Sequence, residues 1–117
     1  MQRWDLHSIE APDGTRDPDV LISEDEGRAV LIRLQPGQEL GEHQVKEHTW
    51  IVVVEGTVQV RCDGEEVEAG TGTLFRFQPD ERHAIASEAG GLILLLLYPW
   101  PGEGHYRGEE KAASRSA

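Results

Sequence analysis

Cysteine is nearly absent from this sequence, since Cys62 is the single one among 117 residues. One cysteine excludes an internal disulfide and fits a reducing compartment. A chain of this length forms one domain and buries enough surface to be stable without disulfides. Cys62 comes just before an Asp63-Gly64 turn signal, with no histidine close to it in sequence. We therefore interpret it as a structural residue and not as a nucleophile.

Long apolar runs are also missing. The longest, residues 92–98, is far too short to span a membrane, and the N-terminus has no apolar signal-peptide core. These two absences predict a soluble, cytoplasmic protein without a membrane partner.

Basic residues are few, because 11 lysines and arginines stand against 22 aspartates and glutamates, which gives a formal net charge of −11. A body this acidic repels phosphate backbones and anionic lipid. The charge therefore argues against nucleic acid and against an anionic membrane surface as partners.

Helical periodicity is absent, since no segment of about ten residues keeps an apolar period of 3.6. Turn signals rich in glycine and proline instead separate short segments of β-branched and aromatic residues. The run 50–54 is expected to end in a turn at Glu55-Gly56, and Asp63-Gly64 is a strong signal for a two-residue hairpin turn. Strands are predicted at residues 29–34, 50–54, 57–62, 65–69, 73–77, 83–87 and 92–98. This pattern predicts an all-β sandwich, jelly roll or small barrel.

The composition also predicts how the chain is divided. Residues 1–27 mix prolines, glycines and acids with two short apolar clusters, which indicates a loop with one or two edge strands. Regular strand spacing runs over residues 28–98. We therefore expect one domain over residues 1–100 and a polar, flexible tail over residues 101–117.

The stretch 41–56 places polar residues beside a buried strand, and a further histidine, His83, follows the loop after the strand at 73–77. With His43 and Gly72, these residues resemble the two motifs of the cupin superfamily, over residues 28–98. The resemblance implies a small, single-domain protein of the cupin-2 kind, folded as a cupin-type double-stranded β-helix or jelly-roll barrel.

The first cupin motif contains His-x-His, then a glutamate, then a glycine. Counting back from Gly56 aligns His43 with the first histidine, Val45 with the second and Thr49 with the glutamate. The first motif therefore keeps the first histidine and the glycine, while Val45 and Thr49 replace the second histidine and the glutamate.

The second cupin motif is also kept in part. Gly72 and His83 match it, whereas Gln78, Asp80 and Ser87 stand where the family has proline, glycine and asparagine. His43 and His83 are thus the two family ligand positions that remain.

Cupin motifs bring histidines and a carboxylate together around a divalent ion, so the resemblance implies weak binding of zinc, iron, manganese or nickel by His43 and His83. Valine and a neutral threonine hydroxyl are poor ligands, which leaves His48 or Glu47 as a possible further one. His48 lies an odd number of residues from His43 and falls on the opposite strand face unless the segment between them bulges. Glu47 lies two residues before Thr49, so its side chain falls on the same strand face as that of Thr49 if the strand begins before Glu47.

Three functions stay open. The first is a small-molecule binding module whose ligand lies near His43, Thr49 and His83, with or without an ion. The second is a metal-dependent cupin enzyme of the dioxygenase, isomerase or decarboxylase type, in which the ion polarises the substrate. The lost ligand positions weaken this second hypothesis, and no residue is assigned a catalytic role. The third is a metal-free barrel kept for dimerisation.

A homodimer is expected because residues 50–54 and 92–97 are apolar at both strand parities. One barrel interior covers only one face of each strand, so the other face must be buried against the N-terminal segment or a second subunit.

Two glycines are expected to serve the backbone and not a ligand. Gly56 and Gly64 each follow an acidic residue at a predicted strand end. If they hold positive φ angles, valine at either position should cost more than about 1 kcal/mol.

Overall fold

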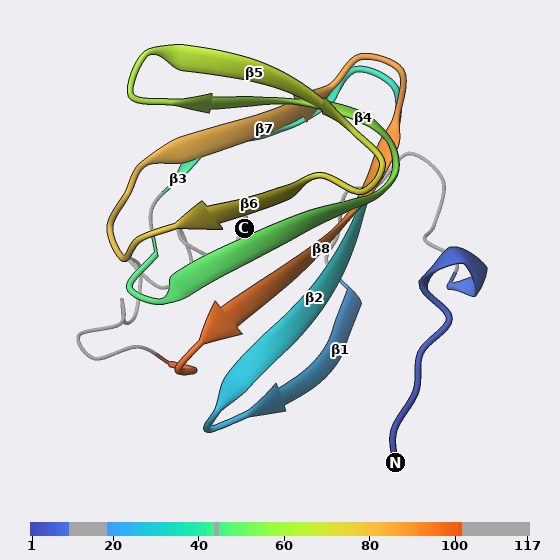
Figure 1. Ribbon diagram of the computed structural model, residues 1–117, viewed down its shortest axis with the longest axis vertical. Coiled ribbons are helices and arrows are strands. Elements are labelled where there is room, and N and C mark those ends of the chain that lie inside the picture. The colour runs from blue at the N-terminus through green and yellow to red at the C-terminus, as the bar shows by residue number, and fades with distance from the viewer. Residues whose placement is uncertain (10–18, 44, 102–117) are drawn as a thin grey trace.

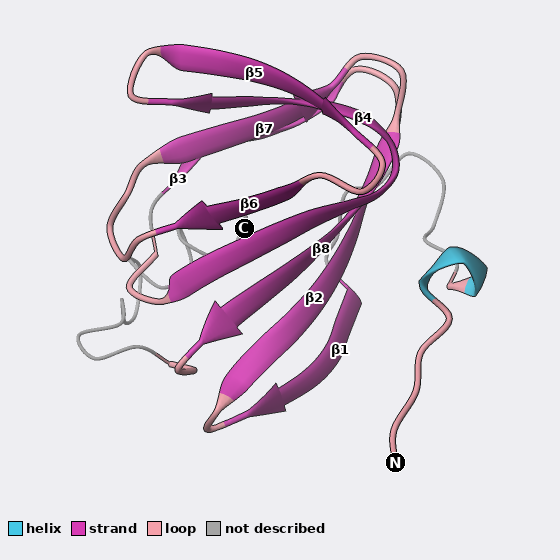
Figure 2. Cartoon of the chain, in the orientation of Figure 1, coloured by secondary structure: helices cyan, strands magenta, loops and turns pink. Residues whose placement is uncertain are grey.

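The three-dimensional structure is a computed structural model that describes residues 1–9, 19–43 and 45–101, with the backbone alone at 41–43. The expected flexible tail, residues 101–117, lies outside this range except for its first residue. The elements are η1 Leu6–Ser8, a 3-10 helix, and the strands β1 Asp19–Glu24, β2 Gly27–Leu34, β3 Gln38–His43, β4 His48–Cys62, β5 Glu65–Gly70, β6 Leu74–Phe77, β7 His83–Ser87 and β8 Gly91–Tyr98 (Figures 1 and 2). The all-β prediction is confirmed. In the described part of the chain, no helix is long and apolar enough to cross a membrane.

The strands form two antiparallel sheets that lie face to face as a jelly-roll barrel. The first sheet has the order β1-β2-β8-β4-β6, and the second has the order β3-β7-β4-β5. Figure 1 shows β4 running through the first sheet and then bending into the second. Strands β5 and β6, which flank the two halves of β4, are edge strands of different sheets.

The expected turn at Glu55-Gly56 was wrong. Strand β4 continues through this point for 15 residues: its first half pairs with β6 and β8, and its second half with β5 and β7. A register shift lies between Val53 and Glu55, and Gly56 has φ +78°. A bulge with a glycine of positive φ bends a strand without reversing it, so the same local signal carries the chain from one sheet to the other.

Other local predictions had mixed outcomes. Asp63 and Gly64 have φ angles of +52° and +76°, which confirms the two-residue hairpin turn. Strand β1 confirms an edge strand within residues 1–27, although residues 10–18 lie outside the described range. The helix η1 and strand β3 were not predicted, because β3 is mostly polar and its partner β7 lies far along the chain.

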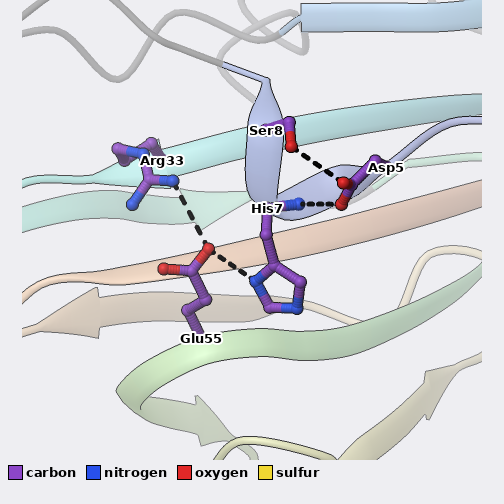
Figure 3. Close-up of polar contacts among 5 residues, drawn as sticks. All are labelled: Asp5, His7, Ser8, Arg33 and Glu55. Atoms are coloured by element: carbon purple, nitrogen blue, oxygen red, sulfur yellow. Dashed lines mark hydrogen bonds and ion pairs between the residues drawn. The ribbon is translucent and has the colours of Figure 1, made fainter.

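The N-terminal segment contacts the barrel at the end where β4 bends. The Nδ1 atom of His7 lies 2.9 Å from Oε2 of Glu55, and an Arg33 guanidinium nitrogen lies 3.7 Å from the same oxygen (Figure 3). Asp5 caps η1 by accepting from the His7 amide and the Ser8 hydroxyl. The hydrogen bond from His7, followed by the Arg33 charge, holds the pKa of Glu55 below its ordinary value. His7 is thus an exposed residue that fixes this segment to β4.

The core lies between the two sheets. Residues that are cross-strand partners share a face, and the inner face is apolar over most of its length. Its buried members include Val30, Ile32, Leu40, Ile51, Val53, Val58, Val60, Ile85, Ile93 and Leu95. On the outer face of β8, Leu96 is 38% exposed and Leu94 is half-buried. The outer face of the first sheet is therefore only partly covered.

Candidate functional site

One end of the barrel interior is polar, and cross-strand register builds it from two rows of residues. In the first sheet, Thr49 is the partner of both Phe77 and Leu97. In the second sheet, His83 is the partner of both His43 and Cys62. The rings of Phe77 and His83 stack with centroids 4.0 Å apart, which joins the two rows across the interior. We call this end, with Glu47, Thr49 and His83 and the backbone position of His43, the mouth; it lies at the left in Figure 1.

His83 is held in a fixed orientation at the mouth. It is 1% exposed, and its Nδ1 atom lies 3.0 Å from the carbonyl oxygen of Glu81. A carbonyl oxygen can only accept, so Nδ1 carries the hydrogen and, in the neutral ring, Nε2 carries the lone pair. Nε2 is therefore the atom able to bind an ion or accept a hydrogen bond from a ligand.

Glu47 and Thr49 are the other two buried polar residues of the mouth. Glu47 is 0% exposed in the bend before β4, and Thr49 is 1% exposed at the start of that strand. The bend is fixed by the Asp80 amide, which donates to the Val45 carbonyl at 2.7 Å. Among the described residues, the Thr49 hydroxyl has no hydrogen-bond partner. A buried hydroxyl without a partner carries a free-energy penalty that a ligand could remove.

The backbone places His43 directly across from His83. The two residues are Cα partners between β3 and β7, beyond a register shift that follows Leu40. Directly opposed residues on neighbouring strands have Cα atoms about 4.5–5.5 Å apart. That their imidazoles share one ligand stays a prediction.

His48 lies on the outer face of the first sheet. It is the cross-strand partner of Tyr98, and the two rings stack with centroids 5.1 Å apart. The Trp50 indole donates to the Tyr98 hydroxyl at 2.6 Å on the same face, and the Arg76 guanidinium lies over Trp50. Of the two candidates for a further ligand, Glu47 is fully buried two residues before Thr49, whereas the His48 ring packs on the outer face of the first sheet.

The pairing of Cys62 with Glu81 was not predicted from the sequence. The thiol donates to Oε2 of Glu81 at 3.2 Å, and Oε1 accepts from the Gln78 amide at 2.9 Å. Burial, and then the Glu81 carboxylate, raise the pKa of Cys62 to about 11, while the Gln78 amide and the thiol lower the pKa of Glu81. Cys62 is therefore a neutral thiol near neutral pH, as expected of a structural cysteine. The two residues lie 19 positions apart, and no local pattern links them.

The donor types near the mouth fit a divalent ion. His43, Glu47 and His83 would offer two imidazoles and one carboxylate, a set that suits iron(II), manganese, nickel or zinc. The fixed tautomer of His83 and the burial of Glu47 are the two features of this structure that favour such an ion.

Comparison with solved structures defines the class of protein. A cupin superfamily protein from Desulfitobacterium hafniense DCB-2 matches with a TM-score of 0.74 and 17% identity, over 80% of this chain and 85% of that one. An RmlC-like cupin from Desulfovibrio desulfuricans matches with a TM-score of 0.74 and 20% identity, over 85% and 96%. An RmlC-like cupin from Shewanella frigidimarina NCIMB 400 matches with a TM-score of 0.70 and 25% identity, over 80% and 86%. The fold is that of the cupins, as the sequence motifs implied.

A family model places the chain more closely. The model of the AraC-like ligand binding domain matches residues 28–103, and the chain belongs to this family. No curated protein matches the sequence.

Proposed function

We propose that this protein is a small-molecule-binding cupin domain that holds its ligand at the mouth, next to His43, Thr49 and His83. The match to a ligand-binding domain family supports the binding of a small molecule in general. The position of the ligand rests on the chemistry of the mouth.

The observation that carries this proposal is the concentration of buried polar groups. Of the four buried polar side chains in the described residues, Glu47, Thr49 and His83 gather at the mouth. The fourth, Ser87, lies at the other end of the interior, where its hydroxyl donates to the Thr57 carbonyl at 2.6 Å. Ser87 is satisfied by the protein itself, whereas the Thr49 hydroxyl has no hydrogen-bond partner among the described residues.

The ligand would bind directly or through an ion. His43, Glu47 and His83 would hold the ion, which would supply a positive charge and open coordination positions for a ligand oxygen or nitrogen. Because Val45 and Thr49 replace two family ligands, we expect the ion to be held weakly.

Thr49→Val tests the proposal through stability and binding together. Valine keeps the shape of threonine and removes the unpaired hydroxyl, so we expect the unbound protein to gain about 1 kcal/mol of unfolding free energy. The rise in melting temperature produced by the best compound of a small-molecule screen should shrink, since that ligand loses a partner. Differential scanning fluorimetry and urea unfolding measure both effects.

Ser87→Ala is the matched control. It removes a buried hydroxyl that has a partner, so it should cost about 1 kcal/mol and leave the ligand-induced rise unchanged. A destabilised Thr49→Val that still responds fully to the screened compound would contradict the site.

We also propose that the protein is a homodimer that pairs through the outer face of its first sheet. Leu74 and Leu96 are 53% and 38% exposed there, beside the half-buried Trp50, Val52 and Leu94. Contiguous apolar surface of this kind is normally covered in solution.

The dimer predicts a species of twice 13.0 kDa in sedimentation velocity at micromolar concentration. Leu96→Lys should shift it to the monomer by placing a charge in the contact. Val20→Lys, at a residue of similar exposure on the edge strand β1, should not. A wild-type protein that sediments only as a monomer would contradict the proposed homodimer.

A further inference from the structure

A cavity of about 360 Å³ opens beside the mouth, between the edge strands β5 and β6. We call it the side cavity; its lining residues are Val60, Cys62, Asp63, Glu65, Val67, Phe75, Phe77 and Glu81. It adjoins the mouth through two of these residues, because Phe77 stacks on His83 and Cys62 is the cross-strand partner of His83. Its volume is in the range of small-molecule pockets.

The lining has a consistent chemistry. Two valines and two phenylalanines form an apolar wall, and Phe75 and Phe77 lie in parallel with centroids 6.3 Å apart. Three carboxylates, of Asp63, Glu65 and Glu81, lie at the polar side, and no lysine, arginine or histidine is among the lining residues of the described chain.

The charge of the side cavity is set by its surroundings. Both carboxylate oxygens of Glu81 accept hydrogen bonds, Oε1 from the Gln78 amide and Oε2 from the Cys62 thiol, which fixes this carboxylate at the cavity. Two arginines of the neighbouring strands have partners of their own: Arg61 binds Glu39 at 2.9 Å, and the Arg76 guanidinium lies over Trp50. A net charge of −11 adds to the negative potential.

We infer that the ligand of this domain is an organic ammonium compound, whose apolar body lies against Phe75 and Phe77 and whose positive charge faces Asp63, Glu65 and Glu81. The inference rests on the proposed function, because it assigns a class to a ligand that spans the side cavity and the adjoining mouth and binds there directly, without an ion. An apolar wall binds the body of such a molecule, and carboxylates near aromatic rings favour its ammonium group. A carboxylate or phosphate ligand would meet three like charges.

Three compounds of similar shape test the charge preference. They are 2-phenylethylammonium, the neutral 2-phenylethanol and the anionic 3-phenylpropanoate. Titration followed by backbone amide NMR should give a dissociation constant at least about tenfold lower for the ammonium than for the alcohol, and no saturable binding of the carboxylate. The amide shifts should centre on residues 60–67 and 75–81. Equal binding of the ammonium and the alcohol would overturn the inference.

Two double variants distinguish the effect of the carboxylates that line the side cavity from the long-range attraction of the acidic protein as a whole. Asp63→Asn with Glu65→Gln should weaken ammonium binding about fivefold or more and leave the alcohol unchanged. Asparagine tolerates the positive φ of residue 63, so the turn should persist. Glu66→Gln with Glu68→Gln removes the same charge from the opposite face of β5, since these residues pair with Arg61 and Gln59. An equal loss in both double variants would overturn the inference, because long-range charge alone would then explain the binding.

Failure of this inference can be told apart from failure of the proposed function. If the ammonium shows no preference while Thr49→Val still removes ligand-induced stabilisation, only the ligand class is wrong. If the ammonium binds with the expected preference but is unaffected by Thr49→Val and His83→Gln, the side cavity acts alone and the site at the mouth is wrong.

Discussion

Gly56→Ala is expected to lower the free energy of unfolding by about 2–5 kcal/mol, or to prevent folding altogether. Gly56 has φ +78°, which an alanine adopts only at a cost of about 1–2 kcal/mol. Its Cβ would also overlap the carbonyl oxygen of Gly90 and lie 2.9 Å from Cα of Gly91. Both neighbours are backbone atoms, so relief requires the junction of β4 and β8 to move, at a further cost of about 1–3 kcal/mol.

Gly64→Ala is the matched control, since Gly64 has a similar φ of +76° but nothing within 4 Å of an added Cβ. It should cost only about 1 kcal/mol, the conformational part of the penalty. Urea unfolding of both variants measures the difference. Equal losses would contradict the account in which Gly56 lets β4 cross closely over β8.

The two glycines also explain where sequence reasoning succeeded and failed. Asp63-Gly64 was predicted correctly because a two-residue hairpin is decided by the local φ preferences of its own residues. Glu55-Gly56 was read as a turn because a glycine of positive φ serves a turn and a bulge equally well. The pairing of Gly56 with Gly91, 35 residues away, decides between them, and no local pattern reports it.

The site shows the same division between local and long-range information. The motif spacing singled out His43 and His83, and strand parity separated Glu47 from His48. The partner of Cys62, the stack of Phe77 on His83 and the side cavity arise from contacts between distant segments. Neither the amino-acid composition nor the spacing of the motifs predicts these contacts. The ligand class could therefore not be assigned from the sequence alone.

His83→Ala is expected to abolish the uptake of a divalent ion. The tautomer held by the Glu81 carbonyl presents Nε2 as a ligand, and alanine removes that donor. Glu47→Gln, which keeps the shape and removes the charge, should weaken uptake at least about tenfold. Imidazole must be unprotonated to bind an ion, so uptake by the wild type should fall as pH drops through the ordinary histidine range near 6.5. Isothermal titration with zinc, on protein made without a histidine tag, measures all three effects.

His48→Ala is the control for these variants, because its ring stacks on Tyr98 at the outer face. It should leave the affinity for zinc unchanged. Loss of zinc binding in His48→Ala together with normal binding in His83→Ala would place the ion outside the barrel and refute the assignment.

The most direct test of the site at the mouth is the long-range proton–nitrogen NMR spectrum of the histidine rings during two titrations, one with zinc and one with 2-phenylethylammonium. Ring nitrogens report both tautomer and ligand contact. His7, near the bend of β4, and His48, whose ring stacks on Tyr98 at the outer face, serve as internal references. The account predicts that the signals of His43 and His83 move together in at least one titration while those of His7 and His48 stay in place. Signals of His43 and His83 that remain unmoved in both titrations, or that move only as much as those of His7 and His48, would contradict it.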